Sequence, residues 1–88
     1  MSNKNKFSFE IGKCYKLIGL NNWVTYSNDR CLYGDRSGIF IKKNDSILIL
    51  SQFHEPGGAI TFISFFYKGD LLYTFFRWDE FDKFEEIQ

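Results

Sequence analysis

The run AITFISFFYKGDLLYTFFRW, residues 59–78, determines the fold class of this chain. Two stretches rich in aromatic and β-branched residues stand on either side of Lys68, Gly69 and Asp70. A short connection that contains glycine, placed between two such stretches, is typical of a β-hairpin. We therefore predict one strand over residues 59–67, a tight turn, and a returning strand that ends at residue 78.

Both faces of this predicted hairpin are apolar. Successive side chains of a strand point to opposite faces. On the first strand this separates Ile60, Phe62 and Phe66 from Ile63, Phe65 and Tyr67, and on the second it separates Leu71, Tyr73 and Phe75 from Leu72, Phe76 and Trp78. Strands that are apolar on both faces are expected where both faces are covered. Either the C-terminal segment or a second protein chain should therefore cover the outer face of the hairpin.

Shorter strand patterns precede the hairpin. Residues 7–11 alternate strictly between apolar and polar side chains, Gly12 interrupts the pattern, and residues 14–18 resume it. Further runs cover residues 23–26, 38–43 and 47–50, and residues 31–33 form a brief one. Short strands separated by turn signals every few residues favour a small barrel or sandwich. We predict a mainly β fold, a small SH3-like barrel or antiparallel meander of about five to six strands, with a short C-terminal helix.

The last residues, RWDEFDKFEEIQ, combine aromatic and acidic side chains. Trp78, Phe81, Phe84 and Ile87 recur at every third position. The positions between them supply five carboxylates, those of Asp79, Glu80, Asp82, Glu85 and Glu86. We predict that residues 79–88 form a helical segment that packs on the sheet, with Phe81 and Phe84 inward and the carboxylates as an acidic rim.

Length and composition indicate one domain over residues 1–88, with residues 1–6 flexible. The net charge is zero, but residues 1–44 hold eight Lys and Arg against three Asp and Glu, and residues 45–88 hold the reverse. No apolar run is long enough for a transmembrane helix, and the polar N-terminus has no signal-peptide pattern. We expect a cytoplasmic protein with Cys14 and Cys31 as free thiols.

The residues that carry chemistry are sparse. The single histidine, His54, lies in a predicted turn beside Glu55, and adjacent residues of an extended chain point apart. Cys14, Cys31 and His54 match no spacing known for structural zinc. No nucleophile elbow, metalloprotease or phosphate-loop motif is present. The sequence therefore predicts that the protein is not an enzyme and holds no metal or cofactor.

The opening FSFEIGKCYKL resembles the first strand of SH3-like barrels, including those of the KOW type, and GIFIKKNDSILIL fits the same meander. In size and in its lack of catalytic residues the chain also resembles small accessory proteins of bacteriophages. Such proteins often bind and inhibit a host or defence enzyme. The resemblance implies an inhibitor or modulator that acts in the host cytoplasm.

Our leading hypothesis is a non-enzymatic protein-binding module that occludes a host or defence protein through exposed aromatics and an acidic patch. The candidate residues are Phe65, Tyr67, Phe76, Trp78, Asp79, Glu80, Asp82, Glu85 and Glu86. The first alternative is a nucleic-acid-binding barrel, because aromatics on a basic face bind single strands. Its residues would be Trp23, Tyr26, Arg30, Tyr33, Arg36, Lys42 and Lys43. The second alternative is a structural protein that forms homodimers through the 59–78 hairpin.

Overall fold

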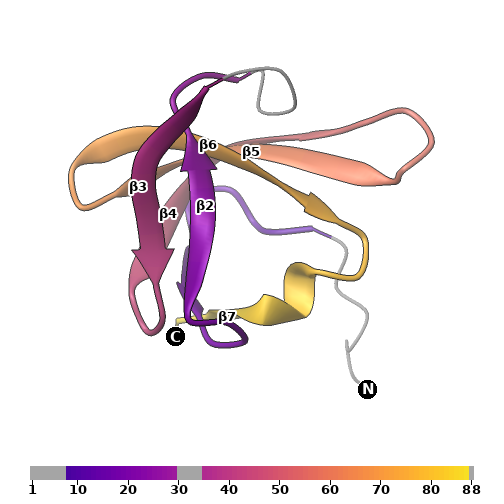
Figure 1. Ribbon diagram of the computed structural model, residues 1–88. Helices are drawn as coiled ribbons and strands as arrows, with labels where there is room; N and C mark the ends of the chain where they lie inside the picture. Colours follow the sequence, from indigo (N-terminus) through magenta and orange to yellow (C-terminus); the bar gives the residue numbers. More distant parts are fainter. Residues whose placement is uncertain (1–7, 30–34, 88) are drawn as a thin grey trace.

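The computed structural model describes residues 8–29 and 35–87, and these form one curled antiparallel sheet (Figure 1). Its strands are β1 (Cys14–Leu17), β2 (Asn22–Tyr26), β3 (Arg36–Lys42), β4 (Ser46–His54), β5 (Ile60–Tyr67), β6 (Asp70–Arg77) and β7 (Phe84–Glu86). One short 3-10 helix, η1 (Phe81–Lys83), lies between β6 and β7. The mainly β prediction is confirmed, and the described residues hold seven strands where about five to six were expected.

The strands lie in the order β3-β2-β6-β5-β4-β1-β7, which places β3 and β7 at the two edges of the sheet. The sheet curls into a half-barrel. The predicted hairpin is its centre: β5 pairs with β6 from Ile60 opposite Arg77 to Tyr67 opposite Asp70. Its turn residues, Lys68 and Gly69, both have positive φ, of 51° and 86°. Two such residues give the turn the twist that a tight hairpin needs.

The core fills the concave side of the sheet. Phe65 and Phe76, from the two strands of the hairpin, are fully buried there beside Tyr15 of β1. Phe9 packs edge-on against Tyr15 and Phe76, with ring centroids 4.5 and 5.1 Å apart. Residues 8–10 form no strand, in contrast to the prediction for residues 7–11. The Phe9 N–H and C=O hydrogen-bond instead to the Gln52 side chain, at 2.9 Å each, so they are not available to a neighbouring strand.

The C-terminal segment crosses the open end of the half-barrel at the foot of Figure 1. The helical segment predicted over residues 79–88 is not found: the chain makes the three-residue 3-10 turn η1 and then pairs Phe84, Glu85 and Glu86 with β1. A three-residue spacing of aromatics is the period of a 3-10 turn, which brings residues three apart to one side. Phe81 and Phe84 are buried, as predicted, but they enter the concave core and leave the outer side of the hairpin uncovered.

The remaining predictions concern Cys14, two short segments and membrane spans. Cys14, on β1, is a free cysteine with an exposed side chain. The predicted pairing at residues 31–33 and the predicted flexible residues 1–6 lie outside the described residues. Among the described residues, no helix has the length and apolar character that a membrane span requires.

Candidate protein-binding face

The convex side of β4, β5 and β6 carries cross-strand rows of side chains that contain no charged residue. The strand register aligns Phe53 with Phe62 and Phe62 with Phe75, and it aligns Ser51 with Ser64 and Ser64 with Tyr73. A further row is made by Leu48, Phe66 and Leu71. We call this surface the outer face. Residues directly opposite on neighbouring strands lie close enough to act as one surface.

Aromatic rings run across the outer face over four strands. Phe53 and Phe62 have ring centroids 6.4 Å apart, Phe62 and Phe75 are 6.1 Å apart, and Phe75 and Tyr26 of β2 are 5.8 Å apart. Neighbouring rings of the row pack against one another, and the ring at one end, Phe53, is 61% exposed. Phe66 and Leu71 are also exposed. Aromatic side chains of this kind dominate the energetics of protein interfaces.

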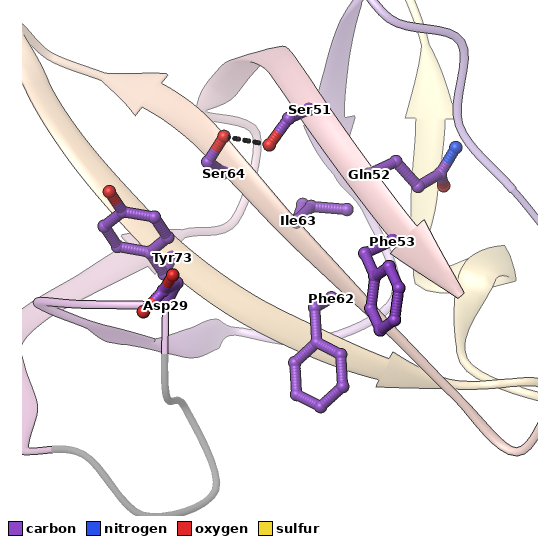
Figure 2. A pocket seen from close by; sticks show the side chains of 8 residues that line it. All are labelled: Asp29, Ser51, Gln52, Phe53, Phe62, Ile63, Ser64 and Tyr73. Atoms are coloured by element: carbon purple, nitrogen blue, oxygen red, sulfur yellow. Dashed lines mark hydrogen bonds between the residues drawn. The ribbon is translucent and has the colours of Figure 1, made fainter. Parts of the chain in front are cut away.

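A hollow of about 510 Å³ lies in the middle of the outer face. Figure 2 shows Phe53 and Phe62 side by side on one side of it, and Tyr73 beside Asp29 on the other. The hydroxyls of Ser51 and Ser64 hydrogen-bond to each other within it. Aromatic walls with a few polar groups suit a side chain or short segment of a ligand. The arrangement contains hydrogen-bonding groups and no paired acid and base for catalysis.

The structure corrects the choice of hairpin face. Phe65, Tyr67 and Phe76 were predicted to bind a partner, but all three side chains are buried in the concave core. Alternation correctly separated the two sets of each strand, but it could not say which set faces the core. The opposite set lies on the convex side, where Phe66 and Leu71 are exposed and Phe62, Tyr73 and Phe75 are half-buried.

Trp78 is the one predicted aromatic contact that stays outside, at 61% exposed. It does not belong to the outer face, because β6 ends at Arg77. It lines a separate hollow of about 430 Å³ with His54, Thr61 and Phe81. His54 hydrogen-bonds through Nδ1 to the Thr61 hydroxyl at 2.8 Å, which gives the ring a structural partner there.

The carboxylates predicted to form an acidic rim are partly engaged in local contacts. Glu80 accepts a hydrogen bond from the Arg77 backbone at 2.8 Å and so closes the turn that follows β6. Glu86 lies 3.6 Å from the Lys13 ammonium, and Asp82 lies 4.0 Å from that of Lys83. Exposed pairs of this kind contribute little to stability. Asp79 and Glu85 are exposed beside them.

Those residues of the nucleic-acid alternative that the structure describes do not form one platform. Trp23 is buried, stacks on Phe76 at 4.7 Å, and donates its indole N–H to Thr74 at 2.9 Å. Tyr26 is buried as well, although it lies on the outer side of β2. Arg36, Lys42 and Lys43 are exposed on and beside β3. Arg30 and Tyr33 lie outside the described residues.

In the described part of the chain, no group of three or more His, Cys, Asp and Glu side chains is placed to hold a metal ion. Cys31, one of the candidates weighed as a ligand, lies outside that part. Comparisons with protein-family models, curated proteins and solved structures find no match to this chain. Its geometry defines the class: a small antiparallel β half-barrel with an aromatic outer face.

Proposed function

We propose that this protein is a non-enzymatic binding module that docks another protein on its outer face. One observation carries the proposal: the rows that run through Phe53, Ser51 and Leu48 are uncharged, aromatic-rich and partly exposed. Contiguous apolar surface of this kind on a small domain marks an interaction site. Rigid aromatic side chains also lose little conformational entropy on binding, so they are efficient anchors.

The mechanism that follows is occlusion. A partner that covers the aromatic row with its own apolar side chains would have that part of its surface blocked. The hollow between Phe62 and Tyr73 offers a place for one anchoring side chain. The acidic rim lies in the turn after β6, in η1 and in β7. Carboxylates such as Asp79 would therefore act on the approach of the partner and not in the contact itself. Inhibition of a host or defence protein, the bacteriophage source and the SH3-like family all stay predictions.

The experiment compares capture of partners by the wild type and by an outer-face variant. Phe53→Ser with Phe66→Ser removes two exposed rings from β4 and β5 without opening the core. The matched control is Ile11→Ser, which changes an equally exposed apolar residue, at 61%, outside the outer face. We expect the double variant to lose specific proteins that the wild type and the control both retain from a lysate of the source cells.

One outcome of the capture experiment would contradict the proposal. If the double variant and the wild type retain the same proteins in the same amounts, the outer face is not the binding surface and the proposal fails. A folded double variant is required for this comparison, and its circular dichroism spectrum and melting temperature establish that it is folded.

A further inference from the structure

Strand β3 lies at one edge of the sheet. It pairs with β2 on one side, and the strand order shows no neighbour beyond it among the described residues (Figure 1). An edge strand presents backbone N–H and C=O groups that another chain can pair with. Adding a strand at such an edge is a recurrent mode of peptide recognition, with the backbone supplying affinity and alternate side chains supplying specificity.

The register identifies the backbone groups that face outward. Lys43 donates its N–H to the Asn21 carbonyl at 2.9 Å, and Ile41 lies opposite Trp23. Every second residue of an antiparallel strand faces the same neighbour, so the backbones of Ile41 and Lys43 face β2. Phe40 and Lys42 therefore direct their backbone groups away from β2. The Lys42 carbonyl accepts the Asp45 N–H at 2.9 Å, and the Lys42 N–H is engaged by the Asp45 carboxylate and the Tyr67 hydroxyl. The N–H and C=O of Phe40 therefore remain for a new strand.

The side chains along this edge have a definite chemistry. Arg36 and Lys42 stand at the two ends of β3, Lys43 follows, and all three are exposed. Asp35 is the carboxylate next to the strand. Phe40, two residues before Lys42, is 42% exposed and lines a hollow of about 340 Å³ with Leu20, Phe75 and Glu80. The edge thus combines an apolar site with a surplus of positive charge.

We propose that the free edge of β3 binds an extended acidic segment of a partner protein by strand addition. The segment places an apolar or aromatic side chain opposite Phe40 and a carboxylate opposite Lys42, two positions away. Opposite charges on directly facing residues of neighbouring strands attract one another. The inference rests on the proposed protein-binding function, to which it adds a second contact and the chemistry of the partner.

A second copy of this chain fits the edge less well. Antiparallel pairing of two β3 strands would bring Arg36 of one copy toward Lys42 of the other, and like charges that face each other destabilise a strand pair. The Gly38 position, with φ of 86°, interrupts the pairing register between β2 and β3. Charged side chains and irregular geometry are the usual means by which proteins keep edges from self-pairing.

The test uses the full chain labelled with ¹⁵N and a synthetic ten-residue peptide in which glutamate alternates with valine around one central phenylalanine. Titration followed by amide chemical shifts should give saturable changes at residues 36–43. The control peptide has the same sequence with N-methyl groups on alternate residues, which removes strand hydrogen bonds but keeps charge and apolarity. It should cause no such changes.

Charge reversal provides the matched protein variants. We expect Lys42→Glu to weaken binding of the glutamate peptide by about five- to tenfold, and a peptide with lysine in place of glutamate to bind this variant better than the wild type. Arg77→Glu, an equally simple reversal on exposed β6 surface, should leave the affinity unchanged.

Three results would overturn the inference. The first is the absence of saturable shifts at residues 36–43 at millimolar peptide. The second is equal binding of the N-methylated peptide or of a single-stranded DNA decamer at that edge. The third is light scattering that shows a concentration-dependent oligomer, which would assign the edge to a second copy. In each case the outer-face capture experiment still decides the proposed function by itself.

Discussion

The hydroxyl of Tyr67, at the end of β5, donates a hydrogen bond of 2.6 Å to Asp45 in the turn between β3 and β4. The Lys68 ammonium lies 3.5 Å from the same carboxylate. The hydrogen bond from Tyr67 holds the pKa of Asp45 below its ordinary value near 3.8. Burial, followed by the hydrogen bond to Asp45, raises the pKa of Tyr67 above its ordinary value. One residue pair thus connects two turns that are distant in the sequence.

This pair makes stability depend on pH in a defined direction. Because the pKa of Asp45 is lowered by folding, its contribution is complete above about pH 4 and is lost as the pH falls through the folded-state pKa. We expect Tyr67→Phe to lower the free energy of unfolding by about 1–2 kcal/mol at pH 7. The difference from the wild type should shrink below pH 3.8. Urea denaturation at pH 7 and pH 3 measures both values.

Tyr73→Phe is the control, since it removes a hydroxyl from the outer face and should leave the acid limb of the stability curve unchanged. A difference between Tyr67→Phe and the wild type that stays constant from pH 7 to pH 3 would show that the Asp45 charge is not involved.

Gly19 illustrates a second single-residue constraint, a close backbone approach. A Cβ atom at this position would lie 3.0 Å from Lys83 Cα and 2.7 Å from Lys83 Cδ. The same contact brings the N–H groups of Ile18 and Gly19 to the Lys83 carbonyl, at 2.8 and 3.1 Å. We expect Gly19→Ala to cost about 1–3 kcal/mol of stability, as overpacking does, measured by urea denaturation.

The double variant Gly19→Ala, Lys83→Ala tests the cause. It removes the side-chain contact but keeps the backbone contact, so most of the loss should remain. Full recovery in the double variant would mean that only the Lys83 side chain was in the way.

Among the elements, the C-terminal segment shows how a strand edge competes with helix propensity. As a helix, residues 84–86 would leave the outer edge of β1 without a partner, and unpaired edge groups are costly or prone to association. As β7 they pair Leu17 with Phe84 and Tyr15 with Glu86. The 3-10 turn before them then places Phe81 5.4 Å from the Phe76 ring. The C-terminal segment therefore has two roles: its rings close the core, and β7 completes the sheet beside β1.

The closing role of this element predicts a large loss of stability when its rings are removed. We expect Phe81→Ala and Phe84→Ala each to lower the free energy of unfolding by about 3–5 kcal/mol, as for buried phenylalanines generally. Ile87→Ala, which truncates an exposed residue of the same segment, should cost far less. Thermal melts followed by circular dichroism compare the variants. Equal melting temperatures for Phe84→Ala and Ile87→Ala would show that the segment does not close the core.

For the whole molecule, the half-barrel has a protected centre and two chemically different edges. β5 is flanked by β4 and β6 along its length, whereas β3 and β7 each have one neighbouring strand in the described part of the chain. The basic residues Arg36 and Lys42 lie on one edge strand, and the acidic residues Glu85 and Glu86 lie on the other. The charge asymmetry of the sequence therefore survives folding at the sheet edges, even though Lys13 and Glu86 meet.

This arrangement predicts a pattern of amide hydrogen exchange. The amide of Phe65, in the central strand, should exchange only with global unfolding, and the amide of Phe40 should exchange faster than that of Ile41 by local opening. Exchange measured by two-dimensional NMR at pH 7 resolves these amides. Slow exchange of Phe40, comparable to that of Ile41, would show that the edge of β3 is already paired in the free protein.

Sequence patterns predicted much of this fold. The hairpin, its turn at Lys68 and Gly69, the burial of Phe81 and Phe84, and the mainly β class all follow from local alternation and turn chemistry. The candidate site was predicted in part: the sequence indicated that one apolar face of the hairpin would need a cover, but the face chosen was the buried one. The row of Phe53, Phe62 and Phe75 was visible in the alternation but could not be assigned to the convex side.

What the sequence by itself determined about this protein is its local periodicity, because backbone sterics and side-chain alternation act between residues close in the chain. What only the tertiary structure decided is which face became the core and what the C-terminal segment became. Both depend on residues far apart in sequence: Phe9 and Trp23 meet Phe76 on the concave side, and β1 supplies the edge for β7. The sheet curls toward the side that these distant rings fill, and the opposite aromatic face stays partly exposed.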